Sequence, residues 1–192
     1  MFFFRKHRES KIVAAVVVHV EPFLRAQELR ESFEASVGPS KARAKSAEVL
    51  ASEPSLLGFI LGLIRGFLRV AGGGMSEDQE RRLSAETLFY LFRNGGWDQI
   101  GPALAANAID SEYFDGCSKG MKLVAYNYGA DYTRDPDICK AIMAGRDLER
   151  IAASLELNMP DPDDERGQVV GGMQWMYFTA PFSDACRNYN CR

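Results

Sequence analysis

SLLGFILGLIRGFLRVAGGG, residues 55–74, is a strongly apolar segment from which the architecture of the chain can be worked out. Its composition predicts a helix that Ser55 caps and the final glycines end. Gly58, Gly62 and Gly66 recur at every fourth position inside it, so they lie near one face. Each glycine costs about 1 kcal/mol of helix stability relative to alanine. We therefore expect another helix to approach this face closely enough to offset that cost.

Three environments are open to this helix. Sixteen or so residues make only about 24 Å of helix, whereas a bilayer core is about 30 Å thick. Arg65 and Arg69 also lie one turn apart on it. We predict the buried central helix of a soluble bundle and no transmembrane segment. A homodimer contact through the three glycines is the second interpretation, and membrane insertion is the third.

The remainder of the chain also favours helices. Ser76 and Gln79 form a capping box, and Asp135-Pro136 is typical of a helix start. Pro22 is expected to kink or divide the first helix. A short alanine-rich helix is expected to hold loosely to the body. The helices expected besides the central one cover residues 10–33, 41–52, 76–94, 102–109, 111–128 and 135–155.

The sequence thus predicts an all-α fold, a single-domain helical bundle of five to seven helices around the glycine-notched helix. Residues 1–9 are expected to be a flexible basic leader, and residues 10–180 the single all-α domain. Glycines at 167, 171 and 172 interrupt any helix after residue 165. Residues 181–192 are expected to be a C-terminal tail, since the final sequence SDACRNYNCR is typical of an exposed or frayed end.

Composition disfavours several classes of function. The chain has 192 residues, a formal net charge of −3 and a pI near 5.5, so a basic nucleic-acid-binding surface is not expected. His7 and His19 are the only histidines, which removes the usual general base from most of the molecule. Neither a Walker loop nor a dinucleotide-binding fingerprint is present, and no cofactor is predicted. The four cysteines are scattered without a C-x-x-C pair, as in a reduced, cytoplasmic protein.

Aromatic side chains gather late in the chain and are open to two interpretations. If they converge, they line a pocket for an apolar or aromatic ligand. If they follow helical spacing, they are ordinary core. The pocket candidates are Tyr126, Tyr128, Tyr132, Trp175 and Tyr177.

Three aspartates, Asp131, Asp135 and Asp137, surround one predicted helix start. Hard cations bind carboxylate oxygens, which makes the three a candidate metal site. Acidic residues at a helix N-terminus are stabilising without a metal, and this capping interpretation is favoured.

The best functional interpretation is a non-enzymatic, cytoplasmic helical protein that acts through self-association or a protein partner, with Gly58, Gly62 and Gly66 as the contact. An alternative is a small helical binder or enzyme for an apolar or aromatic ligand. A second alternative is a peripheral membrane protein that uses the basic, phenylalanine-rich residues 1–24.

Overall fold

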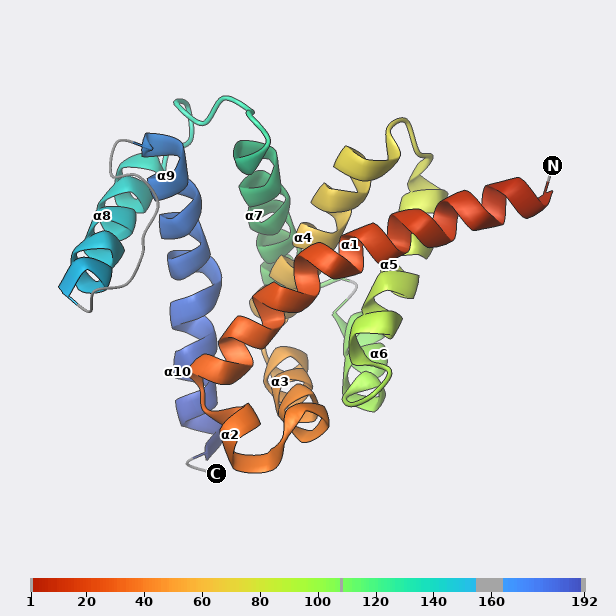
Figure 1. Cartoon of the computed structure of the whole chain (residues 1–192), viewed down its shortest axis with the longest axis horizontal. Coiled ribbons are helices and arrows are strands. Elements are labelled where there is room, and N and C mark those ends of the chain that lie inside the picture. The colour runs from red at the N-terminus through yellow and green to blue at the C-terminus, as the bar shows by residue number, and fades with distance from the viewer. Residues whose placement is uncertain (1, 108, 155–163, 191–192) are drawn as a thin grey trace.

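The computed structural model describes residues 2–107, 109–154 and 164–190. Within these ranges all regular secondary structure is helical, which confirms the all-α fold (Figure 1). The helices outnumber the five to seven predicted, because short segments form helices of their own and the predicted tail is helical. In chain order they are α1 (Phe2–Arg30), α2 (Phe33–Val37), α3 (Pro39–Ser52), α4 (Pro54–Gly72), α5 (Glu77–Phe92), α6 (Trp97–Ala106), α7 (Ser111–Asn127), α8 (Ile138–Ser154), α9 (Glu165–Gln174), the π-helical turn η1 (Trp175–Thr179) and α10 (Ala180–Asn190).

Helix α4 lies at the centre and is buried along most of its length, as predicted. It begins with Pro54 at its first position, where the missing N–H has no partner to lose. Helix α1 crosses over it, and α7 packs along it (Figure 1). The fully buried side chains of α4 supply much of the core: Leu56, Leu57, Phe59, Ile60, Ile64 and Leu68.

Glycines on both partners bring α4 and α7 into backbone contact. A Cβ placed on Gly58 would overlap the carbonyl oxygen of Tyr113, and one on Gly62 would overlap that of Cys117. In the other direction, Gly116 faces the Ser55 carbonyl. The neighbouring helix expected from the glycine spacing is therefore α7 of the same chain.

The first helix differs from its prediction. Helix α1 begins at Phe2, so the backbone of the expected leader is helical, and it continues through Pro22 without a break. It is held to α5 at Glu9, which accepts a hydrogen bond from Gln79 and forms an ion pair with Arg82. The N-terminal end of α1 extends beyond the body of the molecule (Figure 1).

Helix α3 is part of the core, contrary to the expectation that it would hold loosely. Ala42, Ala47 and Leu50 are fully buried, and Arg43 is buried among acidic residues of α1. Small side chains let α3 approach its neighbours closely, so few large apolar residues are needed. A Cβ on Gly96, for example, would overlap that of Ala47.

The C-terminal segment is one continuous helix rather than an exposed tail. Helices α9 and α10 join through η1, and the whole packs against α8, α7, α4 and α3. One column of its buried apolar side chains steps along the chain by four, except for a step of five at the π turn, where one extra residue keeps them on one face. They are Val169, Met173, Phe178, Phe182 and Cys186.

Helix α4 is also the one helix in the described ranges that is long and apolar enough to cross a bilayer. In this structure 61% of its apolar window is buried inside the protein. Core helices of soluble proteins meet the same criterion, and the packing of α4 against α1, α5 and α7 is of that kind.

Candidate functional site

A groove runs along the part of α4 that α7 does not cover. Leu61, Arg65 and Arg69 follow one another at four-residue intervals there, so they form one stripe. Helix α5 supplies one wall and α7 the other, and the end of α6 closes the apolar part. The groove encloses about 490 Å³ and is lined by Leu61, Arg65, Glu77, Arg81, Ser84, Ala85, Leu88, Leu104, Tyr113 and Phe114.

Two smaller hollows continue the groove, and Arg65 lines all three spaces. One follows α7 past Cys117 and encloses about 430 Å³. The other lies over Arg69 and Glu80 and encloses about 440 Å³. Arg65 therefore stands at the junction of two mainly apolar spaces and one polar space.

Arg65 and Arg69 share a single carboxylate. Both arginines donate hydrogen bonds to Glu80, and the bond from Arg69 Nε is 2.8 Å long. Burial by itself raises the pKa of Glu80, but the hydrogen bonds from Arg69 and Arg65 outweigh it and bring the pKa below the usual value. Glu80 is therefore ionised at neutral pH, and the cluster carries two positive charges and one negative charge.

Two further polar groups meet Arg65 in the groove. Arg65 Nη1 lies 3.9 Å from the sulfur of Cys117, and burial raises the pKa of this thiol although Arg65 opposes the shift. Burial raises the pKa of Tyr113 to about 12. At neutral pH both groups are protonated, so neither supplies a negative charge to Arg65.

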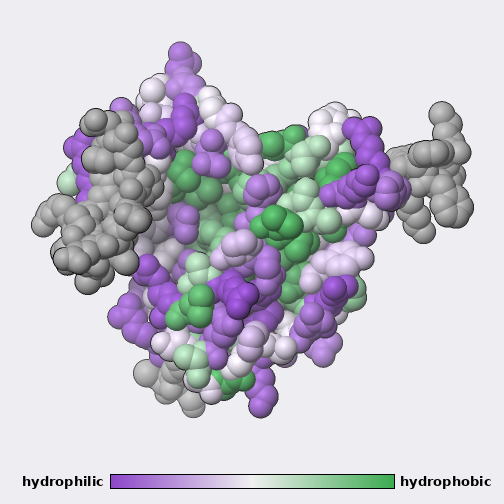
Figure 2. Space-filling model, viewed as in Figure 1, coloured by the Kyte–Doolittle hydropathy of each residue, from purple (hydrophilic) through white to green (hydrophobic). Residues whose placement is uncertain are grey.

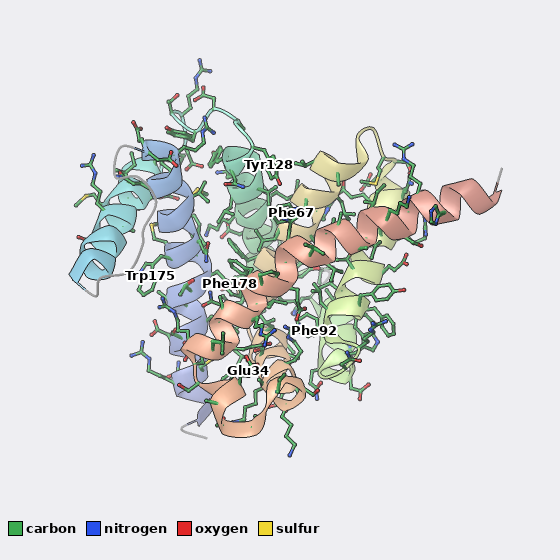
Figure 3. The ribbon with its side chains drawn as sticks, viewed as in Figure 1. Glu34, Phe67, Phe92, Tyr128, Trp175 and Phe178 are labelled. Carbon is green, nitrogen blue, oxygen red and sulfur yellow. The ribbon has the colours of Figure 1, made fainter. Side chains whose placement is uncertain are left out.

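The five aromatic residues predicted as a pocket lie in separate places. Tyr128 stands beside Phe67 near the end of α7, whereas Trp175 lies farther along the C-terminal helix, under the Arg30 guanidinium (Figure 3). The ring centroids of Tyr126 and Tyr132 are 6.1 Å apart, and Tyr126 and Tyr177 both reach the loop before α8.

The tyrosine hydroxyls serve the loop before α8. Tyr126 donates to Asp135 over 2.8 Å, and Tyr177 donates to Asp137 over 2.7 Å. Burial and the hydrogen bond to Asp135 raise the pKa of Tyr126 to about 12. These contacts join α7, the loop and η1, which is a structural role.

Each of the three aspartates has partners of its own. Asp131 accepts hydrogen bonds from Thr133, Asp135 from Lys122, and Asp137 from Lys140. Asp135 also accepts the Asp137 backbone N–H. Burial alone would raise the pKa of Asp135, and these hydrogen bonds lower it below its ordinary value. Among the described residues no group of three or more acidic, histidine or cysteine side chains is arranged to hold a metal ion.

A second cavity, of about 350 Å³, is polar and already paired internally. Arg43 donates to Glu28, to Glu21 over 2.9 Å and to the Leu91 carbonyl. The Arg43 guanidinium also lies 5.6 Å from the ring centre of Phe92 (Figure 3). The charged groups that line this cavity already pair with one another. These pairs hold α1, α3 and α5 together.

Aromatic side chains also reach the surface of α5. Phe89 and Tyr90 are 43% and 41% exposed, and the Phe89 ring packs edge-on against Trp97 at 5.3 Å. The Arg93 guanidinium lies 4.8 Å from the centre of the Tyr90 ring. We call Glu86, Phe89, Tyr90 and Arg93 the α5 face.

Apolar residues gather on another face between α1 and the α8–α9 pair (Figure 2). His19 of α1 stacks on Phe67 there, with the ring centroids 4.9 Å apart. His19 contacts Phe67, and Phe67 in turn contacts Tyr128. The rings in this patch therefore already pack against other side chains of the same molecule.

Sequence reasoning missed the Arg65 groove and the α5 face. The four-residue spacing of Leu61, Arg65 and Arg69 can be recognised in the sequence, but it does not show which helices lie beside these residues. The pattern Gly116-x-x-x-Gly120 in α7 was also readable and would have identified the partner of α4. Comparison of the chain with protein-family models, curated proteins and solved structures finds no match in any of the three.

Proposed function

We propose that this protein acts without catalysis, in the cytoplasm, by binding a second copy of itself through the α5 face. The observation that carries the proposal is the exposure of Phe89 and Tyr90 on a helix whose other large apolar side chains are buried. Exposed apolar groups rimmed by charge mark protein–protein contacts, and aromatic residues are enriched in them.

The charges on this face support a second copy as the partner. Glu86 precedes Phe89 by three residues and Arg93 follows it by four, so the three share one side of α5. In a twofold contact every pair occurs twice. An antiparallel pairing of two α5 helices would place Glu86 next to Arg93 of the second copy, and Phe89 next to Tyr90 of the second copy.

The glycine-notched face of α4 is a poorer candidate for this contact. Gly58 and Gly62 lie against backbone of α7, and Gly66 lies against the Val124 side chain. A second copy would have to displace α7 to reach them. For that reason the proposal assigns self-association to α5 and a packing role to the three glycines.

Sedimentation equilibrium over a range of protein concentrations tests the proposal. The unmodified chain is expected to form dimers as the concentration rises. Replacing both aromatics (Phe89→Ser with Tyr90→Ser) is expected to weaken the dimer at least about tenfold, since central aromatic residues dominate such contacts. A chain that stays monomeric at every concentration contradicts the proposal.

Charge reversal supplies the control. Glu86→Arg alone and Arg93→Glu alone place like charges opposite each other and weaken the dimer. The two changes together restore opposite charges and are expected to recover most of the affinity. Asp184→Arg, an equal change on the exposed side of α10, is expected to have no effect. If the double variant dimerises no better than either single variant, α5 is not paired in this way.

A further inference from the structure

We propose that the groove between α4, α5 and α7 binds an aliphatic monocarboxylate, whose carboxylate lies on Arg65 and whose hydrocarbon chain lies along Leu61, Leu88 and Leu104. The site is independent of the proposed dimer. It uses the side of α5 that carries Arg81, Ser84, Ala85 and Leu88, whereas the α5 face lies on another side of the same helix.

The charge balance at Arg65 supports an acidic ligand. Arg65, Arg69 and Glu80 together hold one positive charge in excess, and the Glu80 side chain is only 7% exposed. Glu80 accepts its hydrogen bond from Arg65 Nε, which leaves the two terminal nitrogens of Arg65 without a bond to Glu80. In the part of the chain that the structure describes, their one partner is the weakly accepting sulfur of Cys117.

The geometry of a guanidinium favours a carboxylate in that position. Arg presents parallel N–H donors that match two carboxylate oxygens, and such charge-assisted bonds strengthen in apolar surroundings. Tyr113 adds a second donor, because it lines the same groove and its hydroxyl makes no hydrogen bond within the described residues. Burial keeps this hydroxyl protonated at neutral pH.

The side chains that line the groove determine the chemistry of the ligand beyond its carboxylate. Leu61, Leu88, Leu104 and Ala85 are aliphatic, and Phe114, which is 55% exposed, adds an aromatic ring to the lining. A volume near 490 Å³ is of the size that small-molecule sites have. An unbranched hydrocarbon chain fits such a lining without leaving polar groups unpaired.

The apolar end of the groove limits the ligand to a single acidic group. With one carboxylate on Arg65, a second one at the far end of the chain would lie among Leu61, Leu88 and Leu104. Burying a charged group among aliphatic side chains is costly, so dicarboxylates are expected to be rejected.

Isothermal titration calorimetry with decanoate, decanol and decanedioate, all below micelle formation, tests the proposal. Decanoate is expected to bind at least about tenfold more tightly than decanol, the usual effect of one charge-assisted contact. Decanedioate is expected to bind more weakly than decanoate. If decanol or decanedioate binds as tightly as decanoate, or if decanoate does not bind, the proposal is wrong.

Variants separate the role of Arg65 from general positive charge. Arg65→Met keeps the apolar stem and is expected to abolish the preference for decanoate over decanol. Arg69→Met, which removes the other partner of Glu80 and one charge of the cluster, is expected to reduce that preference much less than Arg65→Met does. Equal losses in both variants would show a diffuse charge effect and overturn the assignment.

Should Arg65→Met fail to fold, Tyr113→Phe gives a second test. It removes one donor and is expected to lower the affinity for decanoate a few-fold while leaving that for decanol unchanged. An unchanged affinity for both ligands would contradict the placement of the carboxylate. The dimer variants on the α5 face are expected to bind decanoate normally, so failure of one proposal is distinguishable from failure of the other.

Discussion

Gly62 and its neighbours across the α4–α7 contact show how single residues set the distance between two helices. Backbone atoms, rather than side chains, fill the space that a Cβ would need at this position. Backbone cannot change rotamer to make room, so the neighbouring helix itself has to move. The sequence spacing predicted a close approach, and the stability cost of the glycines is offset by close packing along two buried helices.

We expect Gly62→Ala to destabilise the protein by at least about 2 kcal/mol, because added volume in a tight contact forces backbone shifts. Gly101→Ala is the matched control: it lies inside α6, and its Cβ would meet only the Trp97 ring at 3.5 Å. That change is expected to be neutral or to stabilise by about 0.5–1 kcal/mol. Urea unfolding of both variants measures the difference, and similar values for the two would contradict this account of the contact.

Among the elements, α8 depends on a similar contact with α9. A Cβ on Gly172 would overlap the Ala141 carbonyl, and one on Gly145 would overlap the Gln168 carbonyl. Helix α8 packs mainly on α9, with a smaller contact to η1. Its place in the molecule therefore depends on the contact with α9 at these two glycines.

We expect Gly172→Ala to loosen α8 locally. Hydrogen–deuterium exchange is expected to rise along α8 while α4 and α7 remain protected, since the elements of a protein open separately. Gly171→Ala, one residue earlier, would place its Cβ in open space and is expected to leave exchange in α8 unchanged. Exchange that rises equally in α4 would mean that α8 and the centre unfold together.

Sequence patterns predicted the elements better than their partners. The central helix, the Ser76 cap of α5 and the predicted helix 111–128 rest on local chemistry: Ser76 Oγ accepts from Gln79 N, and Gly129, which ends that helix, has a positive φ of 98°. Local sequence patterns did not predict that α3 is buried, because its small residues are buried by contacts with other helices. They also misread residues 165–190, where the glycines lie inside a helix instead of ending it and Gly172 contacts the backbone of α8.

The candidate site was harder to predict. Tyr126 and Tyr177 belong to the aromatic group that was predicted to line a pocket. In the structure each of them donates its hydroxyl hydrogen bond to an aspartate of the loop before α8. Arg65 carried no distinguishing pattern, because its surroundings come from α5, α6 and α7. Such a site depends on tertiary packing, which spacing along one helix does not encode.

For the molecule as a whole, buried ionisable groups limit the pH range of stability. The pKa of Glu80 is lowered below 4.5 in the folded protein, so its contribution is present above about pH 4.5 and is lost as the pH falls through the folded value. The pKa of Cys186 is raised from 9.0 to about 12 by burial, so its contribution is present below pH 9 and is lost as the pH rises toward 12.

We therefore expect the free energy of unfolding to be highest between these limits and to fall on both sides. Each group steepens its limb by at most about 1.4 kcal/mol per pH unit. Urea unfolding across the pH range measures the curve. Glu80→Gln is expected to flatten the acid limb, and Cys186→Ala the alkaline limb; a variant curve that runs parallel to the original on its own limb would contradict the assignment of that group.

The π turn at Trp175–Thr179 has a consequence for how this chain can vary in length. With one residue fewer there, the step of five would become a step of four, and an ordinary α-helix would keep the residues after it on nearly the same face. Phe182 and Cys186 would still point toward the core. A residue lost between these two positions, in regular α-helix, would instead rotate Cys186 by about 100° toward water. A lost codon is therefore expected to be tolerated in the turn and to be harmful in the helix that follows it.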